Sequence, residues 1–553
     1  MKPKIRLHPA KWKFDFLLYL FPVIYLVMGF YFRQIFGDLS LRSIDPEYIH
    51  FISGLSVSMG KFSNANIDQP ASVLHLLLAL IFRTVYFFRE HNLPYFQDVI
   101  YHADRYLAVA NLIITTIISA TLFWGGKAIY RITQNMAFAL SVQTAPFLMN
   151  IWFDLTGRIY AELLFIVPVM IFEVLLFKEI YAPDNRPRKV FGYAGATALG
   201  LSLKMTFLPW SVLPLFLLRS VKQKVKYFFL TILFFLALSP PVLFQLNRFR
   251  QWMISLFLHS GTYESGAKTI INLPLFFKNL ELLFTQTSTL FYVLFVLVFL
   301  LIIGFFRHIK AVETRIGWGL VVSIALVVFI TAKHFEMRYF ISALLFFPFL
   351  LVLNVEILSD FFHQKIVHYV LLLFIPLVIG YKLDREIPYM RIVSQSVEKQ
   401  VNARKETRKA AGMLAKNSYK IIVSQDYGCP FPSYAIMYSF SMGGKSLPHY
   451  KEKLNMLYPD IYQYFTWDNS IRGWGKKFDP ETVVRSNKPV YLYLQKNSKT
   501  LYRRTLQKFF GDTMPFTIRK KLLFENPENK EAILQLYFSK IKPADTGRKV
   551  PVK

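Results

Sequence analysis

The chain has 553 residues, 54% of them hydrophobic, and its mean hydropathy is positive at +0.35. The apolar residues gather in runs of about 18–25, the length that crosses a bilayer as a helix, which excludes a soluble enzyme, a disordered chain and a fibrous protein. A lone cysteine, Cys429, excludes an intramolecular disulfide and a multi-cysteine metal site. In a membrane protein, the net charge of +31 indicates cytoplasmic loops and lipid headgroups rather than nucleic acid.

The first 14 residues carry five Lys or Arg and lack the cleavage site of a secretory signal, so we predict a cytoplasmic stub. Eleven apolar runs follow, and they predict a polytopic α-helical membrane protein. The predicted spans lie near residues 15–36, 104–123, 136–152, 160–177, 190–206, 208–218, 227–244, 285–306, 316–332, 338–358 and 366–381.

The segment 70–88 is long enough to cross the membrane, but it carries Arg83 in its middle and His75 near its start. If it lies along the outer interface, the predicted inside loops hold 19 Lys and Arg in 64 residues, and the outside loops between spans hold 11 in 120. This bias follows the positive-inside rule. If the segment crossed, the basic loops at 186–189 and 219–226 would face outward. We therefore predict an interfacial helix, with a crossing helix as the alternative.

Residues 382–553 are much less apolar and hold 32 Lys and Arg against 15 Asp and Glu. The segments YKIIVSQ (419–425) and PVYLYLQK (489–496) have the composition of strands, and helical stretches lie between them. We predict a transmembrane domain over 1–381 and a soluble C-terminal α/β domain over 382–553. An odd number of spans places this domain outside the membrane, and long translocated domains escape the charge rule.

Charged residues from separate segments fall on the outer side under this topology. They are Asp45 and Glu47 in the first outside loop, Asp154 and Arg158 in the second, Glu162 just inside the next span, Lys204 at a span end, His259 in the loop 245–284, and Lys333 and Arg338 before the tenth span. Most of them alone have an ordinary explanation, as a turn, a helix cap or an interfacial anchor. Glu162 is the exception, because a carboxylate near the start of an apolar span is costly unless it is paired or functional. Together they place carboxylates, which can accept a proton, beside cations, which hold phosphate. The pattern predicts a lipid-phosphate substrate at the outer interface.

Six short motifs contain or adjoin these residues: Asp45-Pro46-Glu47-Tyr48, Asn66 to Ser72, Ala103 to Leu107, Ser141 to Glu162, Leu203 to Thr206 and Glu336 to Tyr339. Their arrangement resembles the GT-C glycosyltransferases that use polyprenyl-phosphate sugars, in particular the protein O-mannosyltransferase and aminoarabinose-transferase branches. The resemblance covers roughly residues 15–355, and the chain departs from the family pattern at Gln69, Ala71 and Ser72.

The resemblance implies a GT-C-like fold with interfacial helices and an inverting sugar transfer at the outer face of a bacterial inner membrane. Asp45 then takes the proton of the acceptor hydroxyl, and Glu47, Asp154 and Glu162 orient the acceptor or bind a divalent cation. The donor phosphate is held by Arg158, Lys204 and Arg338, with Lys333 and His259 behind them. Glycan, lipid and protein acceptors are all compatible with the motifs, and metal dependence is open.

Two other functions are compatible with the same features. A transporter or flippase of a lipid-linked glycan would also need cations for phosphate, but it would place polar residues deep in the spans. A scaffold for envelope assembly would use the basic tail to bind anionic lipids or glycans. Loss of sugar transfer in Asp45→Asn, with donor binding kept, would distinguish an enzyme from both.

Overall fold

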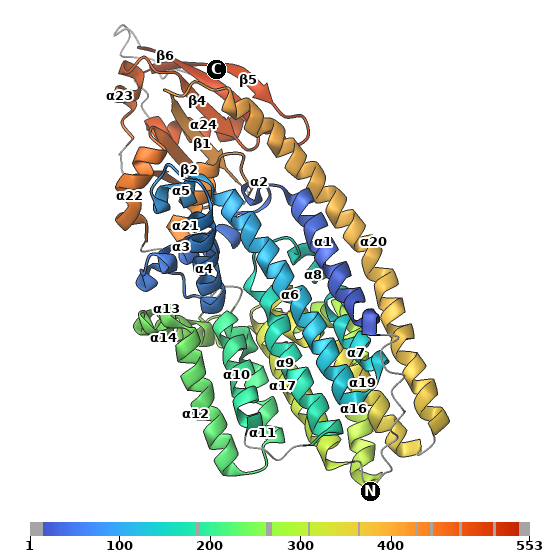
Figure 1. Ribbon diagram of the computed structural model, residues 1–553. Coiled ribbons are helices and arrows are strands. Elements are labelled where there is room, and N and C mark those ends of the chain that lie inside the picture. The colour runs from blue at the N-terminus through green and yellow to red at the C-terminus, as the bar shows by residue number, and fades with distance from the viewer. Residues whose placement is uncertain are drawn as a thin grey trace. The chain divides into compact units, whose positions relative to one another are not determined.

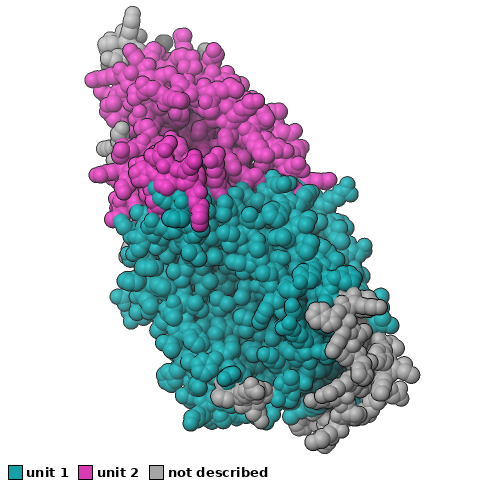
Figure 2. All heavy atoms as spheres, in the orientation of Figure 1, with its two compact units in different colours: residues 1–34, 53–87, 106–394 teal, residues 35–52, 88–105, 395–553 magenta. Residues whose placement is uncertain are grey.

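The structure, a computed structural model, describes residues 15–183, 188–260, 268–307, 310–362, 365–425, 428–442, 446–474, 478–511 and 516–540. The predicted N-terminal stub, 1–14, lies outside these ranges. The described chain is mainly helical and contains one small sheet (Figure 1). It divides into two compact units (Figure 2): unit 1 comprises Met1–Gln34, Ser53–Phe87 and Tyr106–Ser394, and unit 2 comprises Ile35–Ile52, Phe88–Arg105 and Gln395–Lys553.

Four described helical segments are long and apolar enough to cross a membrane. They are Asp15–Phe36, α6 (Ala103–Thr133), α17 (Ala311–Lys333) and Met337–Phe361. The first joins η1 (Asp15–Tyr19) and α1 (Leu20–Phe36), and the last joins η7 (Met337–Phe340), α18 (Ile341–Leu345) and most of α19 (Phe347–Phe362). A fifth results if α15 (Leu273–Gln286) and α16 (Ser288–Arg307), which meet at 93°, count as one span. Their length and composition make the chain an integral membrane protein, while the eleven predicted spans stay a prediction.

Several predicted spans are shorter or interrupted helices, in part because proline removes a backbone donor and ends the helical hydrogen-bond ladder. Pro146 is the second residue of η3, Pro209 lies inside η5, and Pro214 is the second residue of α11. The pieces are α7 (Met136–Gln143), η3 (Ala145–Leu148), α8 (Asn150–Leu155), η4 (Ala161–Phe165), α9 (Ile166–Tyr181), α10 (Arg188–Leu203), η5 (Met205–Ser211), α11 (Leu213–Leu217), α12 (Val221–Leu238) and α13 (Pro240–Leu243). The predicted outside loop 245–284 contains a further helix, α14 (Leu246–Leu258). The predicted interfacial segment forms the 17-residue helix α4 (Ser72–Phe88).

Two adjacent glycines on α6 let neighbouring side chains of unit 1 approach its backbone closely. A Cβ at Gly125 would lie 2.0 Å from Sδ of Met170 on α9, and one at Gly126 would lie 2.3 Å from Nε2 of Gln143 on α7. Gln143 donates from that nitrogen to the carbonyl of Leu122 at 3.0 Å. Small residues thus allow the close packing, and a hydrogen bond from the side-chain amide of Gln143 links α7 to α6 in an apolar setting.

Unit 2 contains the sheet, with strand order β3-β2-β1-β4-β6-β5. The strands are β1 (Tyr419–Ser424), β2 (Ile461–Phe465), β3 (Ser470–Gly473), β4 (Val490–Leu494), β5 (Phe516–Glu525) and β6 (Ala532–Lys540). β1 pairs in parallel with β2 and β4, and the other pairs are antiparallel. The two predicted strands are β1 and β4, so a small C-terminal α/β structure is confirmed.

Helices complete unit 2 and connect its strands. They are α21 (Pro432–Met442), α22 (Ser446–Leu457), α23 (Pro480–Arg485) and α24 (Lys499–Phe510), with α2 (Leu39–Arg42), α5 (Tyr95–Tyr101) and the start of α3 (Glu47–Ser58) from the N-terminal part of the chain. α24 buries Leu501, Leu506 and Phe509 in the same core as β1 and β4. The helix α20 (Lys365–Gly412) runs without a break through the predicted domain boundary at 381.

Candidate anion-binding site

A buried ion pair joins two of the predicted site residues in unit 1. Glu162 lies in the first turn of η4, Lys204 lies between α10 and η5, and each side chain is only 3% exposed. The Lys204 ammonium donates to Glu162 Oε1. Nε of Arg338 lies 3.7 Å from the same oxygen. Glu162 therefore faces two cations away from water, as a buried carboxylate requires.

The backbone around Lys204 is held from two sides. Its N–H donates to the carbonyl of Gly200 at 2.9 Å, and the N–H of Ala71 donates to the carbonyl of Leu203 at 3.1 Å. Ala71 adopts φ +44°, a left-handed conformation that costs an L-residue energy. The motif at 66–72 thus supports the end of α10 directly before Lys204.

Aromatic rings line the cations. The Tyr160 ring centroid lies 4.6 Å from the guanidinium carbon of Arg158 and 5.5 Å from that of Arg338. The Lys204 ammonium lies 4.3 Å from the ring centroid of Tyr339. Such cation–π contacts hold the charged groups without neutralising them. Arg158, Lys204 and Arg338 form what we call the cation cluster.

The arginines of the cation cluster are less exposed than the carboxylates that lie beside them. The side chains of Arg158 and Arg338 are 9% and 15% exposed, whereas those of Asp154 and Glu336 are 36% and 37% exposed. A carboxylate oxygen of Asp154 lies 3.8 Å from Nη1 of Arg158, and one of Glu336 lies 3.8 Å from Nε of Arg338. Arginine suits the oxygens of a phosphate in a bidentate geometry.

Lys333 and His259, the two other predicted phosphate ligands, lie at the C-terminal end of α14. Lys333 Nζ donates to the carbonyls of Leu256 and Phe257 at 2.8 and 2.9 Å, and His334 Nε2 lies 3.0 Å from the Leu256 oxygen. His259 is the C-cap residue of the same helix. A cation at a helix C-terminus satisfies its last carbonyls, so this geometry gives Lys333 a capping function.

The predicted acidic pair of the first loop belongs to unit 2. Asp45 is half-buried, and its Oδ2 accepts a hydrogen bond from the hydroxyl of Tyr438 at 3.1 Å. The Ser43 hydroxyl donates to the Asp45 carbonyl at 2.9 Å, and the Asp45–Pro46 peptide is cis. Glu47 is buried in the first turn of α3. Each unit therefore contains part of the predicted site.

A polar network next to this loop was not predicted from the sequence. Asp104 accepts hydrogen bonds from the hydroxyls of Tyr48 at 2.8 Å and Ser40 at 3.0 Å, and Nη1 of Arg408 lies 3.8 Å from it. Burial raises the pKa of Tyr48 well above its usual range, so its hydroxyl stays a donor. The sequence signal for this network is the position of Asp104 at the start of an apolar run, where a carboxylate is expected to have a buried polar partner.

A second unpredicted contact fixes the motif at 66–72 in unit 1. Arg248 on α14 donates to both carboxylate oxygens of Asp68, at 3.1 and 3.3 Å. Gln245 donates to the carbonyl of Ala65 at 2.9 Å. These residues lie some 180 positions apart in the chain, and no sequence pattern links them.

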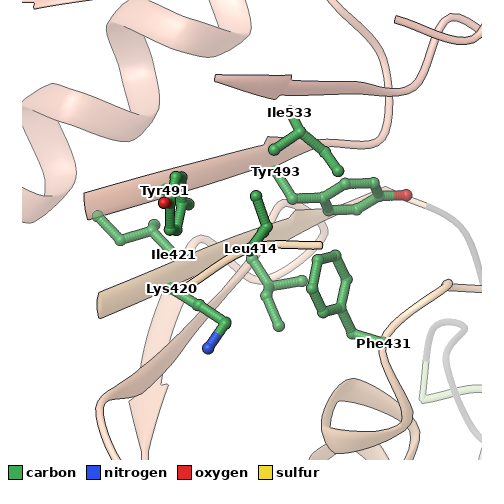
Figure 3. A pocket seen from close by; sticks show the side chains of 8 residues that line it. Leu414, Lys420, Ile421, Phe431, Tyr491, Tyr493 and Ile533 are labelled. Atoms are coloured by element: carbon green, nitrogen blue, oxygen red, sulfur yellow. The ribbon is translucent and has the colours of Figure 1, made fainter. Parts of the chain in front are cut away.

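No group of three or more His, Cys, Asp or Glu in the described ranges is placed to hold a metal ion. Figure 3 shows a hollow in unit 2, lined by Leu414, Lys420, Ile421, Ile422, Phe431, Tyr491, Tyr493 and Ile533. Its interior leaves no room for a water molecule, so it is a packing defect rather than a ligand site.

The sequence matches no protein-family model and no curated protein. Among solved structures, the chain resembles ArnT from Cupriavidus metallidurans bound to undecaprenyl phosphate, with a TM-score of 0.47 and 10% identity over 93% of this chain and 97% of that one. The apo structure of the same ArnT gives a TM-score of 0.46, with the same identity and coverage.

Proposed function

We propose that the protein is a membrane glycosyltransferase that transfers a sugar, with inversion, from a polyprenyl-phosphate donor to an acceptor hydroxyl at the outer face of the membrane. The observation that carries this proposal is the cation cluster, whose members come from three separate segments of unit 1. Lys204 and Arg338 both face Glu162, and Arg158 shares the ring of Tyr160 with Arg338. The GT-C motifs of the sequence lie on the same residues.

In this reaction the cation cluster binds the donor phosphate. Arg158 and Arg338 supply paired N–H donors, and Lys204 supplies a point charge. Glu162 keeps Lys204 and the Arg338 side chain in place. As the sugar leaves, negative charge grows on the phosphate oxygen, and fixed cations stabilise that charge without rearranging.

Asp45 takes the proton of the acceptor hydroxyl as general base. The acceptor oxygen then forms a bond to the anomeric carbon, while the bond from that carbon to the phosphate oxygen breaks. A single displacement of this kind inverts the configuration and releases polyprenyl phosphate. Glu47 and Asp154 orient the acceptor.

Two substitutions separate binding from chemistry. We expect Arg338→Ala to weaken binding of undecaprenyl phosphate about 10- to 100-fold, because it removes charge-assisted hydrogen bonds. We expect Asp45→Asn to leave that affinity unchanged and to lower transfer about 100-fold or more, as loss of a general base does. The exposed Arg219, replaced by alanine, is the matched control.

Binding is measured with undecaprenyl phosphate in nanodiscs. Transfer is measured from undecaprenyl phosphate that carries labelled mannose, glucose or aminoarabinose to an envelope extract. Unchanged affinity in Arg338→Ala would contradict the proposed phosphate site, and full transfer in Asp45→Asn would contradict the assignment of Asp45 as the base. Tight binding without transfer of any of the three sugars would favour a transporter.

A further inference from the structure

The acidic first loop of unit 2 is contacted by a tyrosine from the C-terminal segment. Tyr438 on α21 donates its hydroxyl to Oδ2 of Asp45 at 3.1 Å. Its side chain is 1% exposed, and the ring of Trp467 meets it edge-on at 5.5 Å. Because packing fixes the ring, the hydroxyl points at Asp45 from a constant direction.

Arg404 of α20 holds the backbone a few residues before Asp45. Its Nη1 donates to the carbonyl of Leu41 at 2.7 Å, and its Nε lies 3.3 Å from the buried carboxylate of Glu531 on the segment before β6. A Cβ at Gly428 would lie 2.0 Å from that Nη1, so this approach requires glycine. The guanidinium therefore links the loop to the start of β6, an inner strand of the sheet.

Arg408, one turn further along α20, holds the loop through side chains. It pairs with the carboxylate of Asp38, and its Nη2 donates to Ser40 Oγ at 2.6 Å. Its Nε donates to the carbonyl of Pro430 at 2.9 Å, and the N–H of Cys429 donates to the Ser40 carbonyl at 2.8 Å. The segment from 38 to 45 is thus fixed at several points by residues 404–438.

We propose that the C-terminal segment of unit 2 positions the acidic loop, and that Tyr438 is a positioning residue that orients the Asp45 carboxylate for proton transfer. This inference rests on the proposed function, in which Asp45 is the base. A carboxylate on a loop can rotate, and a donor on one oxygen restricts that rotation and favours the charged form. The basic C-terminal region then acts in catalysis without contacting the substrate.

The test compares Tyr438→Phe with Tyr464→Phe in the full-length protein. Tyr464 is also a buried tyrosine of unit 2, but its hydroxyl donates to Asn469 instead of the acidic loop. We expect Tyr438→Phe to lower kcat about 10-fold, since a hydrogen bond to a charged group is lost, with the affinity for undecaprenyl phosphate unchanged. The acidic limb of the pH–rate profile should move to higher pH, because the carboxylate loses a donor that favours its charged form.

A second readout needs no turnover. Amide hydrogen exchange at residues 38–48 should rise in Tyr438→Phe and Arg404→Gln and stay at the wild-type level in Tyr464→Phe. Wild-type kinetics and exchange in Tyr438→Phe, with transfer lost in Asp45→Asn, would overturn the positioning role and leave the proposed function standing. Wild-type transfer in Asp45→Asn would overturn the proposed base and the positioning role together.

Discussion

The carboxylate of Glu162 is buried against Lys204 and Arg338, where removal of one partner leaves the others without compensation. Breaking a buried ion pair from one side typically costs about 3–5 kcal/mol, since the remaining charge stays desolvated. We expect Glu162→Gln to lower the free energy of unfolding by about that amount, measured by denaturant titration in mixed micelles.

Glu336→Gln is the control for this change. Glu336 also faces Arg338, but its side chain is more exposed and the two charged groups are 3.8 Å apart. Solvent-exposed pairs of this kind contribute about 1 kcal/mol or less. If the two substitutions lowered the free energy of unfolding equally, the burial of the Glu162 ion pair would not contribute to stability.

The left-handed backbone of Ala71 should lower the free energy of unfolding by an amount that a substitution can measure. Its φ of +44° is left-handed, and its N–H bonds the last carbonyl before Lys204. Glycine adopts this conformation without the Cβ clash. We expect Ala71→Gly to raise the free energy of unfolding by about 0.5–1 kcal/mol after the entropy of glycine is counted, in the same titration. A loss of stability would show that the methyl group contributes more through packing than the strain costs.

At the scale of elements, α10 and η5 depend on a glycine for their contact. A Cβ at Gly200 would lie 2.1 Å from Cδ1 of Phe207, a buried ring that packs 5.3 Å from Phe165. We expect Gly200→Ala to cost about 1–3 kcal/mol through overpacking and to weaken undecaprenyl phosphate binding, because Lys204 follows one turn later.

Gly195 offers the matched position on the same helix. A Cβ there meets nothing within 4 Å, so Gly195→Ala should stabilise α10 by up to about 1 kcal/mol through helix propensity. Thermal unfolding of both variants and their phosphate affinity would be compared. If the two alanines behaved alike, the contact with Phe207 would not determine the geometry of the site.

The elements show what sequence patterns could and could not predict. Apolar runs identified where helices lie, and β-rich segments identified β1 and β4, because both signals are local. The breaks at Pro209 and Pro214 were merged into one span, since hydropathy averages over a window and ignores backbone donors. The N-terminal segments that join unit 2 were also invisible, because burial between distant segments leaves no local period.

At the scale of the whole molecule, the natural cysteine permits a test of orientation. Cys429 is fully buried, and burial raises the pKa of its thiol to about 12, so it should resist a membrane-impermeant maleimide. Cysteines introduced at the more exposed positions Asp154 and Lys416 should be labelled from outside intact cells, and one at Lys222 should be protected. Labelling at 222 with protection at 154 would mean that the segment 70–88 crosses the membrane.

The candidate site was predictable as a set of residues but only in part as an arrangement. A carboxylate near the start of an apolar run is costly, and this favoured Glu162 before any contact was known. Lys204 and Arg338 were predicted from their place on the outer side and from their motifs. No local pattern indicates that Lys333 caps α14 or that Tyr438 contacts Asp45. Both contacts join residues that are far apart in the chain: Tyr438 lies 393 positions after Asp45.

The last strand of the described sheet, β5, places three consecutive cations, Arg519, Lys520 and Lys521, in exposed positions. An edge strand can pair with a strand of another molecule, and repulsion between like charges on the two strands opposes that pairing. Ions shorten the range of this repulsion to about 3 Å at 1 M salt. Concentrated salt should therefore promote self-association through β5, and a Lys520→Ser/Lys521→Ser double variant should self-associate in dilute buffer, as light scattering would reveal.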